Sequence, residues 1–392
     1  MEVGIDALPL MGRGGVSRHL TELLPALVGR GEGHRYHLFA RVFRPAQRRR
    51  YREAARAFAG PRLVWHRVFV PDRLLELAWT RRDVALPGTA RCLGGLDVFL
   101  ATAGLAPAGA PCPIVGIVHD LVPLRFPQWF GAEVPTIRAR LERLAARSRL
   151  LLAVSESTRQ DLVELLGVPA GRVRVVHHGI HPRFAAPPPE RAGTLLRARG
   201  IEGPYFLYVG GLGPVKNVGA LLEAFRMARE RARTTHTLVL AGDPRWAGGL
   251  PADVERLGLA GAVRFLGFLD DDALPALYAG ATALVLPSFW ESFGFPALEA
   301  MACGAPVLAA RVGALPEVLG DAALFVAPDR PAELAEQMTR LAGDAAVRGD
   351  LAARGRARAA RFTWERAAAE TLAVLEEAAA PPMDAAASTR AR

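Results

Sequence analysis

The sequence TALVLPSFWESFGFPALEAMACGAPVLAARVGALPEV, residues 282–318, contains the clearest pattern of secondary structure in this chain. It begins with a short continuous apolar run, residues 283–286, which has the length of a strand buried on both faces. A proline–serine pair ends the run, and Pro296 is expected to open a helix, because proline loses no hydrogen bond at the first helical position. Gly304 has the place of a left-handed helix cap, and residues 306–309 begin the next strand. The stretch therefore predicts one βαβ unit of a parallel sheet.

The loop of this unit is the first candidate site, because open α/β sheets bind ligands at the carboxyl ends of their strands. The amides of Phe293, Gly294 and Phe295 are expected to point out of the helix N-terminus, a position suited to phosphate. Two carboxylates flank this position, Glu291 in the loop and Glu299 one turn into the helix. Acidic side chains repel a bare phosphate, so we expect them to accept hydrogen bonds from hydroxyls beside it, as a sugar nucleotide would offer.

The spacing Glu291-x7-Glu299 inside PSFWESFGFPALEAMACGAPV resembles the signature of glycosyltransferase family 4. The resemblance implies that the first glutamate holds the donor sugar and the second holds the ribose. It also implies an α/β fold of GT-B type, in which two Rossmann-like domains face each other across a cleft. The competing interpretation is two acids that merely suit the helix dipole, which would be preferred for an isolated pair.

A chain of 392 residues is long enough for two domains of ordinary size. The helical pattern over residues 354–377 predicts one C-terminal helix anchored by Phe362 and Trp364. We expect four segments: residues 1–185 as an N-terminal acceptor-binding Rossmann-like domain, 186–204 as a linker, 205–378 as a C-terminal nucleotide-sugar-binding Rossmann-like domain with C-terminal helices, and 379–392 as a disordered tail.

The net charge of +10 is unevenly distributed along the chain. Residues 1–185 hold 27 arginines against 15 carboxylates, and the remainder is slightly acidic, which suggests a partner for the first half only. Residues 41–58 concentrate the basic side chains on a predicted helix. Two interpretations remain open for it, docking on an anionic membrane surface or a solvated helix in an arginine-rich sequence. We expect no nucleic-acid partner, because no recognition helix or aromatic stacking motif accompanies the charge.

The cellular location is predicted from two features that the sequence does not show, a membrane-spanning segment and a signal peptide. No apolar run approaches the length that spans a bilayer, and the N-terminus carries acids where a signal peptide carries bases. The cysteines Cys92, Cys112 and Cys303 have no metal or redox spacing. We expect a cytoplasmic protein with reduced thiols, placed peripherally on the inner face of the membrane if the basic half docks there.

A glycine turn follows the first predicted strand and contains Gly14 and Gly15, which let a backbone approach a phosphate closely. Ser17 stands where a dinucleotide fingerprint has its third glycine, and the strand over residues 36–40 does not end in an acid that could hold a ribose. These departures disfavour a dehydrogenase. The family resemblance implies that the two glycines cover the donor pyrophosphate.

His119 and Asp120 follow a buried strand predicted for residues 114–118, again at the functional edge of a sheet. The stretch VHDLVPLRFPQWF is similar to a segment that many family 4 members carry. The resemblance implies that His119 lies beside the reacting sugar and that Asp120 and Arg125 lie on the acceptor side. A structural role is the competing interpretation for a single histidine at a strand end.

A second group of histidines, His177, His178 and His181, raises a metal hypothesis. Adjacent residues of a strand point to opposite faces, so the first two cannot easily share one ion. The resemblance places His181 where the family usually has an aspartate. We therefore expect no metal site here.

The second half repeats the plan of the first, with a strand over residues 205–209, a glycine turn and a helix. The turn carries Lys216, the single lysine of the chain, followed by Asn217. A point charge in this turn can meet a diphosphate. The family pattern adds an arginine nearby that this chain lacks, so Arg13 or another arginine would have to compensate. The resemblance also implies that Phe268, at the end of a later strand, packs against the nucleotide base and that Asn217 contacts the donor.

The resemblance implies transfer of a hexose from a nucleotide sugar to a glycan or lipid-linked acceptor, with retention of configuration and without a metal or other cofactor. Because the leaving diphosphate gains negative charge, preorganised donors should accelerate the reaction. We expect His119, Lys216 and Glu291 to form the catalytic set. The HDL-PL-FP stretch resembles mannosyltransferases, which implies GDP-mannose, with UDP-glucose and UDP-N-acetylglucosamine as open alternatives. A non-catalytic sugar-nucleotide sensor is the alternative from another class, and it predicts binding without donor hydrolysis.

Overall fold

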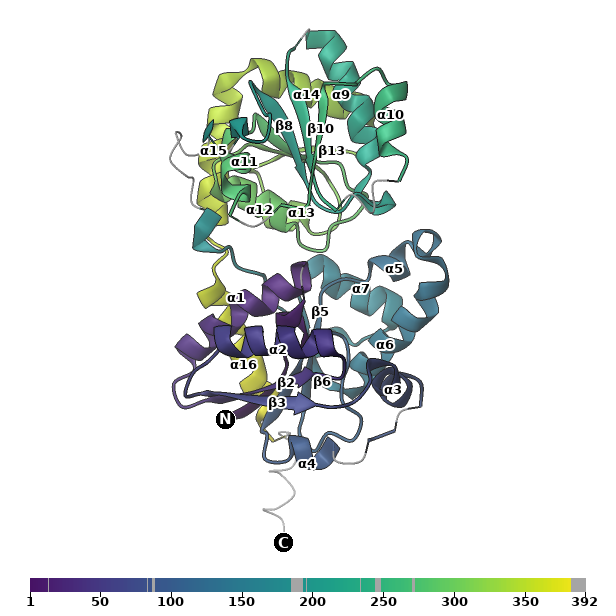
Figure 1. Cartoon of the computed structure of the whole chain (residues 1–392), viewed down its shortest axis with the longest axis vertical. Coiled ribbons are helices and arrows are strands. Elements are labelled where there is room, and N and C mark those ends of the chain that lie inside the picture. Colours follow the sequence, from purple (N-terminus) through teal and green to yellow (C-terminus); the bar gives the residue numbers. More distant parts are fainter. Residues whose placement is uncertain are drawn as a thin grey trace. The chain divides into compact units, whose positions relative to one another are not determined.

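The chain forms two compact units, Met1–Gly179 with Trp364–Arg392 and Ile180–Thr363, and each is an α/β domain (Figure 1). This confirms the expected class of two parallel-sheet α/β domains. The computed structural model describes residues 1–12, 14–82, 84–86, 89–184, 193–194, 196–232, 234–243, 248–269 and 272–381.

The first unit is built on a seven-stranded sheet of order β3-β2-β1-β4-β5-β6-β7, in which every pairing is parallel. The strand order reverses between β1 and β4. The loops that follow these two strands therefore run in opposite directions, and the crevice between them is the position where an open α/β sheet binds ligands. The strands are β1 (Glu2–Asp6), β2 (Arg35–Arg41), β3 (Leu63–Val68), β4 (Val98–Ala101), β5 (Ile114–Val118), β6 (Ser148–Ala153) and β7 (Val173–Val175).

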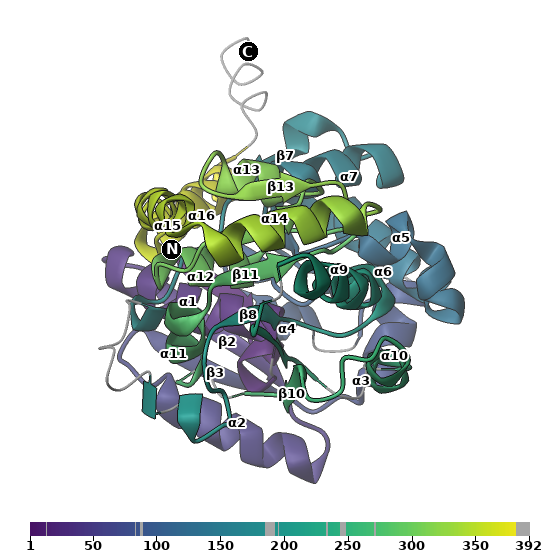
Figure 2. The same cartoon turned by 90° about the horizontal axis from the view of Figure 1, so that it is seen from above.

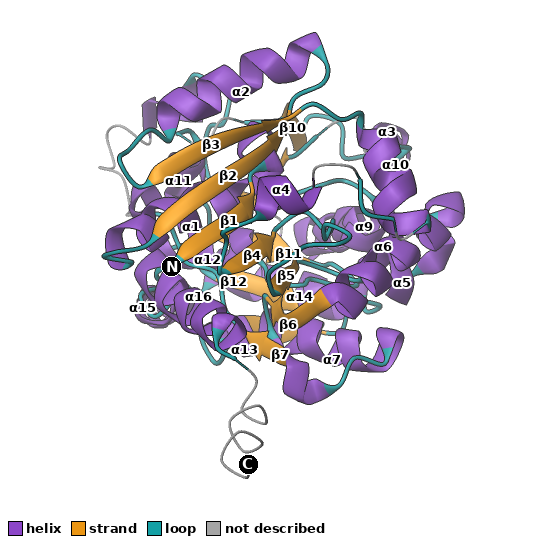
Figure 3. Ribbon diagram, turned by 90° about the horizontal axis from the view of Figure 1, so that it is seen from below, coloured by secondary structure: helices purple, strands orange, loops and turns teal. Residues whose placement is uncertain are grey.

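The helices of the first unit cover this sheet. One pair, α1 (Gly15–Arg30) and α16 (Trp364–Ala379), packs together, and α16 also contacts β4, β5 and β6 (Figure 3). Leu144 and Leu162 of two other helices pack with Ile114 and Val118 of β5 in one apolar core. The remaining helices are α2 (Pro45–Ala57), α3 (Asp72–Leu75), α4 (Thr89–Leu93), α5 (Val122–Arg125), α6 (Val134–Arg147) and α7 (Glu156–Leu166).

The second unit has a six-stranded parallel sheet of order β10-β9-β8-β11-β12-β13. Its four central strands are almost entirely apolar and buried, as strands covered on both faces must be. The strands are β8 (Tyr205–Val209), β9 (Thr237–Ala241), β10 (Val263–Gly267), β11 (Ala283–Leu286), β12 (Val307–Ala310) and β13 (Leu324–Val326).

Two helix layers accompany this second sheet. One contains α9 (Val218–Ala232) and α14 (Pro331–Gly343), which pack against each other (Figure 2). In the other, α12 (Phe295–Ala302) contacts β11, β12 and α15 (Ala345–Ala359). The remaining helices are α10 (Leu250–Arg256), α11 (Leu274–Gly280) and α13 (Leu315–Leu319).

The organising stretch folds as β11–α12–β12, with two small differences from the prediction. The helix begins at Phe295 rather than Pro296, and β12 begins at Val307 rather than at residue 306. Gly304 has the expected left-handed conformation, with φ of 81°. Residues 186–192 and 195 of the expected linker, residues 382–392 of the expected tail, and Arg13 lie outside the described residues.

The prediction of one helix over residues 354–377 within the second domain is wrong. The helix ends at Ala359, and α16 begins at Trp364 and belongs to the first unit. Thr363, which precedes α16, is a residue type favoured at helix N-caps. Phe362 and Trp364 are both buried, as expected of anchors, but they anchor different units: Phe362 contacts Phe293, and Trp364 contacts residues of the first unit.

Within the described residues, no helix combines the length and the apolar character that a bilayer crossing requires. The three cysteines are free thiols, of which Cys92 is exposed and the other two are buried.

Candidate active site

The centre of the site in the second unit is an ion pair between Lys216 and Glu291. Lys216 ends a 3-10 turn (Pro214–Lys216) after β8, and Glu291 lies in the loop after β11, a strand that pairs directly with β8. The Nζ–Oε1 distance is 2.8 Å, and the side chains are 30% and 12% exposed. Ser288 Oγ donates to the same carboxylate oxygen at 2.7 Å. Two of the three residues expected to be catalytic are therefore in direct contact, at the carboxyl edge of the sheet.

The lysine turn is tied to the glutamate loop by hydrogen bonds. Asn217 follows the lysine in the left-handed conformation, and its Nδ2 donates to the carbonyls of Pro287 at 3.0 Å and Pro328 at 2.8 Å. The amide of Phe289 donates to the carbonyl of Val215 at 2.8 Å. The Asn217 amide group was expected to contact the donor, but the structure uses it to position the turn.

The backbone of Glu291 is held by a second loop, which follows β12. Ala314 donates its amide hydrogen to the Glu291 carbonyl at 2.8 Å. Gly313 has φ of 52°, and a Cβ placed there would lie 2.3 Å from the same carbonyl oxygen. Only glycine allows this approach. Gly313 was not recognised from the sequence, although it stands inside the quoted stretch in the loop after a predicted strand.

Glu299 has a different environment from Glu291. It is 1% exposed, and Tyr278 Oη of α11 donates to its Oε2 at 2.8 Å. Burial and the nearby Glu299 charge raise the pKa of the Cys303 thiol to about 12. Because Tyr278 donates a hydrogen bond to it, the Glu299 carboxylate would already be oriented when a ribose hydroxyl arrives. Tyr278 was not recognised from the sequence, because a tyrosine on a short apolar helix looks like an ordinary core residue.

The N-terminus of α12 offers fewer amides than the sequence suggested. Gly294 is the N-cap, with φ of 96°, so Phe293 and Gly294 precede the helix. Pro296 has no N–H, and the amide of Ala297 donates to the Gly294 carbonyl at 3.0 Å. The Phe293 ring is buried and contacts the Phe295 ring edge to face. Phosphate binding at this terminus would consequently depend on few groups, and Lys216 becomes the main positive charge.

Three other residues expected to contact the donor, Gly14, Gly15 and Phe268, have free space or exposed surface beside them within their own units. Gly14 is the N-cap of α1 with φ of 99°, and a Cβ at Gly14 or at Gly15 would meet no atom within 4 Å. A ligand can therefore approach the backbone of this turn closely. In the second unit, Phe268 follows the edge strand β10 and is 58% exposed.

His119 follows β5 in the first unit and is partly buried. Burial lowers its pKa to about 4, and a hydrogen bond to the Thr102 carbonyl opposes this shift only in part. Its Nε2 has no hydrogen-bond partner among the described residues, so we assign the bond to Thr102 to Nδ1. His119 is then the neutral Nδ1–H tautomer, and its Nε2 lone pair can accept a hydrogen bond. This is the state that can hold a hydroxyl group.

The two residues expected on the acceptor side, Asp120 and Arg125, differ in their hydrogen-bond partners. Asp120 is exposed, and its Oδ1 accepts the amide hydrogen of Val122 at 3.3 Å. Arg125 donates from Nε to Asp161 Oδ1 at 2.9 Å and from Nη2 to Glu164 Oε2 at 3.1 Å, both on α7. The Arg125 guanidinium thus joins α5 to α7 inside the first unit, which leaves Asp120 as the better candidate for an acceptor contact.

The histidines after β7 have local partners. His181 Nδ1 accepts the amide hydrogen of Arg183 at 2.9 Å, as an aspartate would in a capping turn. His178 instead contacts His19. In the part of the chain that the structure describes, no group of three or more His, Cys, Asp or Glu side chains is arranged to hold a metal ion.

Two parallel-sheet α/β domains, with a lysine–glutamate pair at the carboxyl edge of the second sheet, are typical of a glycosyltransferase of GT-B type. Residues 198–358 match the family described as Glycosyl transferases group 1, and residues 13–184 match Glycosyltransferase Family 4. The O-antigen chain mannosyltransferase B of Escherichia coli is 32% identical over 257 residues, covering 65% of this chain and 68% of that protein. The chain belongs to glycosyltransferase family 4, as its sequence resemblance indicated.

Two further similarities extend this result. A D-inositol 3-phosphate glycosyltransferase of Salinispora arenicola is 34% identical over 287 residues, covering 68% of this chain and 64% of that protein. The crystal structure of Anabaena Alr3699/HepE in complex with UDP and glucose has a TM-score of 0.74 and 20% identity, covering 96% of this chain and 99% of that one. At this identity the structural likeness shows the GT-B fold.

Proposed function

We propose that this protein transfers a hexose, with mannose as the first candidate, from a nucleotide sugar to a glycan or lipid-linked acceptor with retention of configuration. The observation that carries the proposal is the 2.8 Å pair of Lys216 and Glu291 on adjacent strand ends. It brings together a cation suited to a diphosphate and a carboxylate suited to sugar hydroxyls. In a parallel α/β sheet this edge is the ligand-binding edge.

Lys216 would stabilise the leaving diphosphate. An ammonium group has three N–H donors, and one of them is directed at Glu291, so the others can meet phosphate oxygens. The charge that develops on the diphosphate in the transition state is where such a preorganised donor accelerates the reaction. The proposal assigns this role to a side chain, so it requires neither a metal nor another cofactor, and activity should survive chelation with EDTA.

The other residues would orient the donor. Glu291 would accept a hydrogen bond from a sugar hydroxyl, and Glu299, oriented by Tyr278, would accept one from the ribose. The exposed ring of Phe268 would pack against the base, and the open turn at Gly14 and Gly15 would approach the pyrophosphate. His119 would accept a hydroxyl hydrogen bond through its Nε2.

The choice of donor rests on similarity. The Escherichia coli relative is named as a mannosyltransferase, which favours GDP-mannose. The Anabaena structure holds UDP and glucose, so UDP-glucose is the principal alternative, together with UDP-N-acetylglucosamine. The Salinispora relative is named as a D-inositol 3-phosphate glycosyltransferase, so a soluble acceptor is the alternative to a lipid-linked one.

A thermal-shift screen against a panel of nucleotide sugars tests the donor assignment. A ligand that binds only the folded state stabilises it by RT ln(1 + [L]/Kd), about 2.7 kcal/mol at a hundredfold excess over Kd. We expect GDP-mannose to raise the midpoint more than free GDP, and Lys216→Ala to reduce the shift. A larger shift with UDP-glucose would replace mannose by glucose, and no shift with any nucleotide sugar would contradict the proposed function.

A surface of the first unit supports docking on an anionic membrane. Helix α2 presents several exposed arginines, and only Ala54 of this helix is fully buried. Two exposed aromatic side chains stand at the strand ends beside it, Phe43 after β2 and Phe69 after β3, with exposed fractions of 51% and 58%. The exposed arginines are Arg44, Arg48, Arg49, Arg50, Arg52 and Arg56. We call this set the α2 surface.

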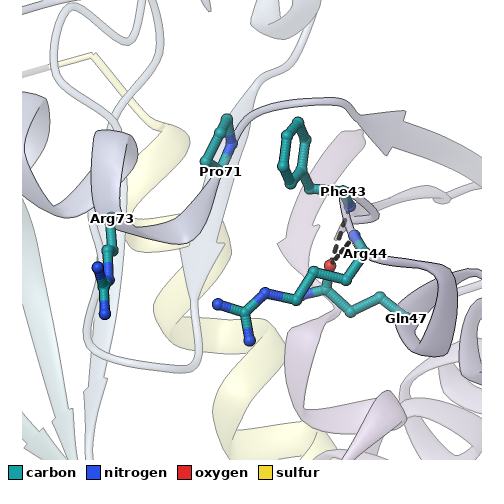
Figure 4. Close-up of a pocket in the computed structure, with 5 residues that line it drawn as sticks. All are labelled: Phe43, Arg44, Gln47, Pro71 and Arg73. Carbon is teal, nitrogen blue, oxygen red and sulfur yellow. Dashed lines mark hydrogen bonds between the residues drawn. The ribbon is translucent and has the colours of Figure 1, made fainter.

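A small cavity of about 80 Å³ lies in the α2 surface and is lined by Phe43, Arg44, Gln47, Pro71 and Arg73 (Figure 4). The Gln47 side chain holds its rim, because Oε1 accepts the amide hydrogens of Phe43 at 2.9 Å and Arg44 at 2.7 Å. Basic side chains beside exposed aromatic rings are typical of segments that bind the membrane interface. We propose a cytoplasmic protein that docks peripherally on the inner face of the membrane to reach a lipid-linked acceptor.

A further inference from the structure

Three histidines from distant parts of the sequence meet inside the first unit. His19 lies on α1, His119 follows β5, and His178 follows β7. His19 Nδ1 and His178 Nδ1 are 2.8 Å apart, so one ring donates to the other. The rings of His19 and His119 pack edge to face with centroids 5.0 Å apart, and those of His119 and His178 lie 6.0 Å apart at 23°. Trp364 of α16 packs on the cluster 5.8 Å from His19.

His19 and His178 are buried and His119 is partly buried, and this loss of water around the rings keeps them neutral. Burial lowers the pKa of His19 and of His178 well below the ordinary value, and the neighbouring histidines lower both further. A second proton would place a positive charge beside the other two rings without a counter-ion. The His19–His178 hydrogen bond is therefore a neutral one, in which a single proton lies between two nitrogens.

The cluster also contains ring nitrogens without protein partners. Neither His19 Nε2 nor His119 Nε2 has a hydrogen-bond partner among the described residues, and both atoms are buried. A buried polar nitrogen without a partner is costly, so it requires a physical reason. For His119 the reason is that Nε2 keeps a lone pair that can accept a hydrogen bond. Its Nδ1–H is assigned to the Thr102 carbonyl, and Thr102 Oγ1 in turn donates to the Asp6 carbonyl at 2.5 Å.

We propose that His19 and His178 are positioning residues that clamp the His119 ring so that its Nε2 lone pair is presented to a substrate hydroxyl. The proposal rests on the role of His119 in the proposed function. The hydrogen bond between His19 and His178 fixes both rings, and the edge of His19 against His119 fixes the third. The bond to Thr102 sets the Nδ1–H tautomer of His119, and the contacts with His19 and His178 set the direction in which the His119 Nε2 points.

The test replaces His19 in two ways. Asparagine keeps a hydrogen-bonding group near the place of Nδ1, whereas leucine removes it. We expect His19→Leu to lower kcat at least about tenfold with the nucleotide-sugar KM changed less than about twofold, and His19→Asn to recover most of the loss. Wild-type kcat in His19→Leu, or equal losses in both variants, would overturn the clamp.

The chain offers a matched control in the same unit. His37 Nδ1 lies 2.8 Å from His66 Nε2, so His37→Leu also breaks a histidine–histidine hydrogen bond, but in a pair for which no ring contact with His119 is found among the described residues. It should leave kcat unchanged. An equal loss of kcat in His37→Leu would show that the effect is a general one on the unit.

A second readout does not depend on activity. Long-range ¹H–¹⁵N NMR of the full chain labelled in histidine reports each tautomer directly. We expect His119 as a neutral Nδ1–H tautomer at pH 7, preserved in His19→Asn. In His19→Leu the ring is no longer held in the direction that lets Nδ1–H reach Thr102, so its tautomers should average. An Nε2–H tautomer in the wild type overturns the proposal. If the wild type turned over no nucleotide sugar, the proposed function would fail while this spectrum still decided the clamp.

Discussion

Lys216 and Glu291 are 75 residues apart in the sequence, yet Lys216 Nζ donates to Glu291 Oε1 at 2.8 Å. The cation expected to bind phosphate and the carboxylate expected to bind sugar thus share a hydrogen bond before a donor arrives. A diphosphate that approaches Lys216 must compete with, or join, this carboxylate. The two residues should consequently act as one unit, and their substitutions should not be independent.

The first prediction concerns Lys216. We expect Lys216→Ala to lower kcat about a hundredfold or more, because the leaving diphosphate loses its main positive charge. Lys216→Arg should recover only part of the loss, since a guanidinium differs in shape and reach. Steady-state kinetics on the preferred nucleotide sugar measure both. An alanine variant with near-normal turnover would remove the lysine from the mechanism.

The coupling between Lys216 and Glu291 can be measured in a double-mutant cycle with Lys216→Ala and Glu291→Gln. Residues in contact show interaction energies of about 0.5–3 kcal/mol, whereas separate sites add. We expect the double variant to be much less impaired than the sum of the single variants. Simple additivity in kcat/KM would mean that the observed ion pair does not exist in the working enzyme.

The second prediction concerns the two glutamates, which should differ in what they bind. Glu291→Gln should reduce transfer while free nucleoside diphosphate still binds, because the sugar contact is lost. Glu299→Gln should weaken binding of the free nucleotide as well, through the ribose. Calorimetric titration with the nucleoside diphosphate separates the two effects, and equal losses in both variants would contradict the division. Glutamine is preferred at position 299 because alanine would leave the buried Tyr278 hydroxyl without its acceptor.

The third prediction concerns Gly313. Its φ of 52° and the 2.3 Å approach of a Cβ to the Glu291 carbonyl mean that Gly313→Ala must displace the Glu291 loop. We expect a loss of activity and a lower denaturation midpoint. Gly349→Ala is the control, because Gly349 is an exposed helical residue whose Cβ would meet nothing within 4 Å. It should stabilise the protein by up to about 1 kcal/mol. Equal effects would show that the approach to Glu291 is unimportant.

The fourth prediction concerns pH. The pKa of His119 is lowered to about 4 in the folded protein, so the unfolded chain binds its proton more readily. The stability contributed by neutral His119 is therefore complete above pH 6.5 and is lost as the pH falls toward 4, by about 2 kcal/mol at pH 5. Burial shifts His19 and His178 in the same direction, so their contributions add to the loss. Urea denaturation at pH 7 and pH 5 measures the difference, and His119→Asn should reduce it. An unchanged pH dependence in this variant would contradict the assignment.

The fifth prediction concerns the α2 surface. Each arginine near an anionic membrane contributes about 1 kcal/mol, so this cluster suffices for reversible docking. Reversing Arg48, Arg49, Arg50 and Arg52 to glutamate should abolish sedimentation with anionic vesicles and leave donor hydrolysis intact. Salt should weaken the wild-type interaction, because the attraction fades over about 8 Å at physiological ionic strength. Neutral vesicles are the control. If the wild type does not sediment with anionic vesicles at low salt, α2 is a solvated helix and a soluble acceptor is favoured.

Local patterns were enough to predict most of the fold. The continuous apolar runs at residues 114–118, 205–209 and 283–286 are strands with the expected bounds, because strands buried on both faces have no polar interruptions. The break between α15 and α16 was missed, since the helical pattern runs through residues 360–363 with neither proline nor glycine. Contact with the first unit, a tertiary effect, decides where α16 lies.

The site was predictable only where a motif names its residues. Lys216 and Glu291 were both selected from the sequence, but their contact depends on the pairing of β8 with β11. Tyr278 and His19 were missed, because single polar residues on apolar helix faces look like core positions until the tertiary fold shows their partners. Arg125 was selected by its position beside His119, but its partners on α7 could not be identified from that segment alone.

If the Lys216–Glu291 pair catalyses transfer from a nucleotide sugar, the protein must release nucleoside diphosphate from one member of a panel of nucleotide hexoses, and the rate of this release is the decisive measurement. We expect the wild type to release diphosphate from one donor, with GDP-mannose first, and Lys216→Ala to do so at about one hundredth of that rate or less. Tight binding of a nucleotide sugar by the wild type, without any release of diphosphate in the presence or absence of acceptors, would contradict the claim and identify the protein as a non-catalytic sensor.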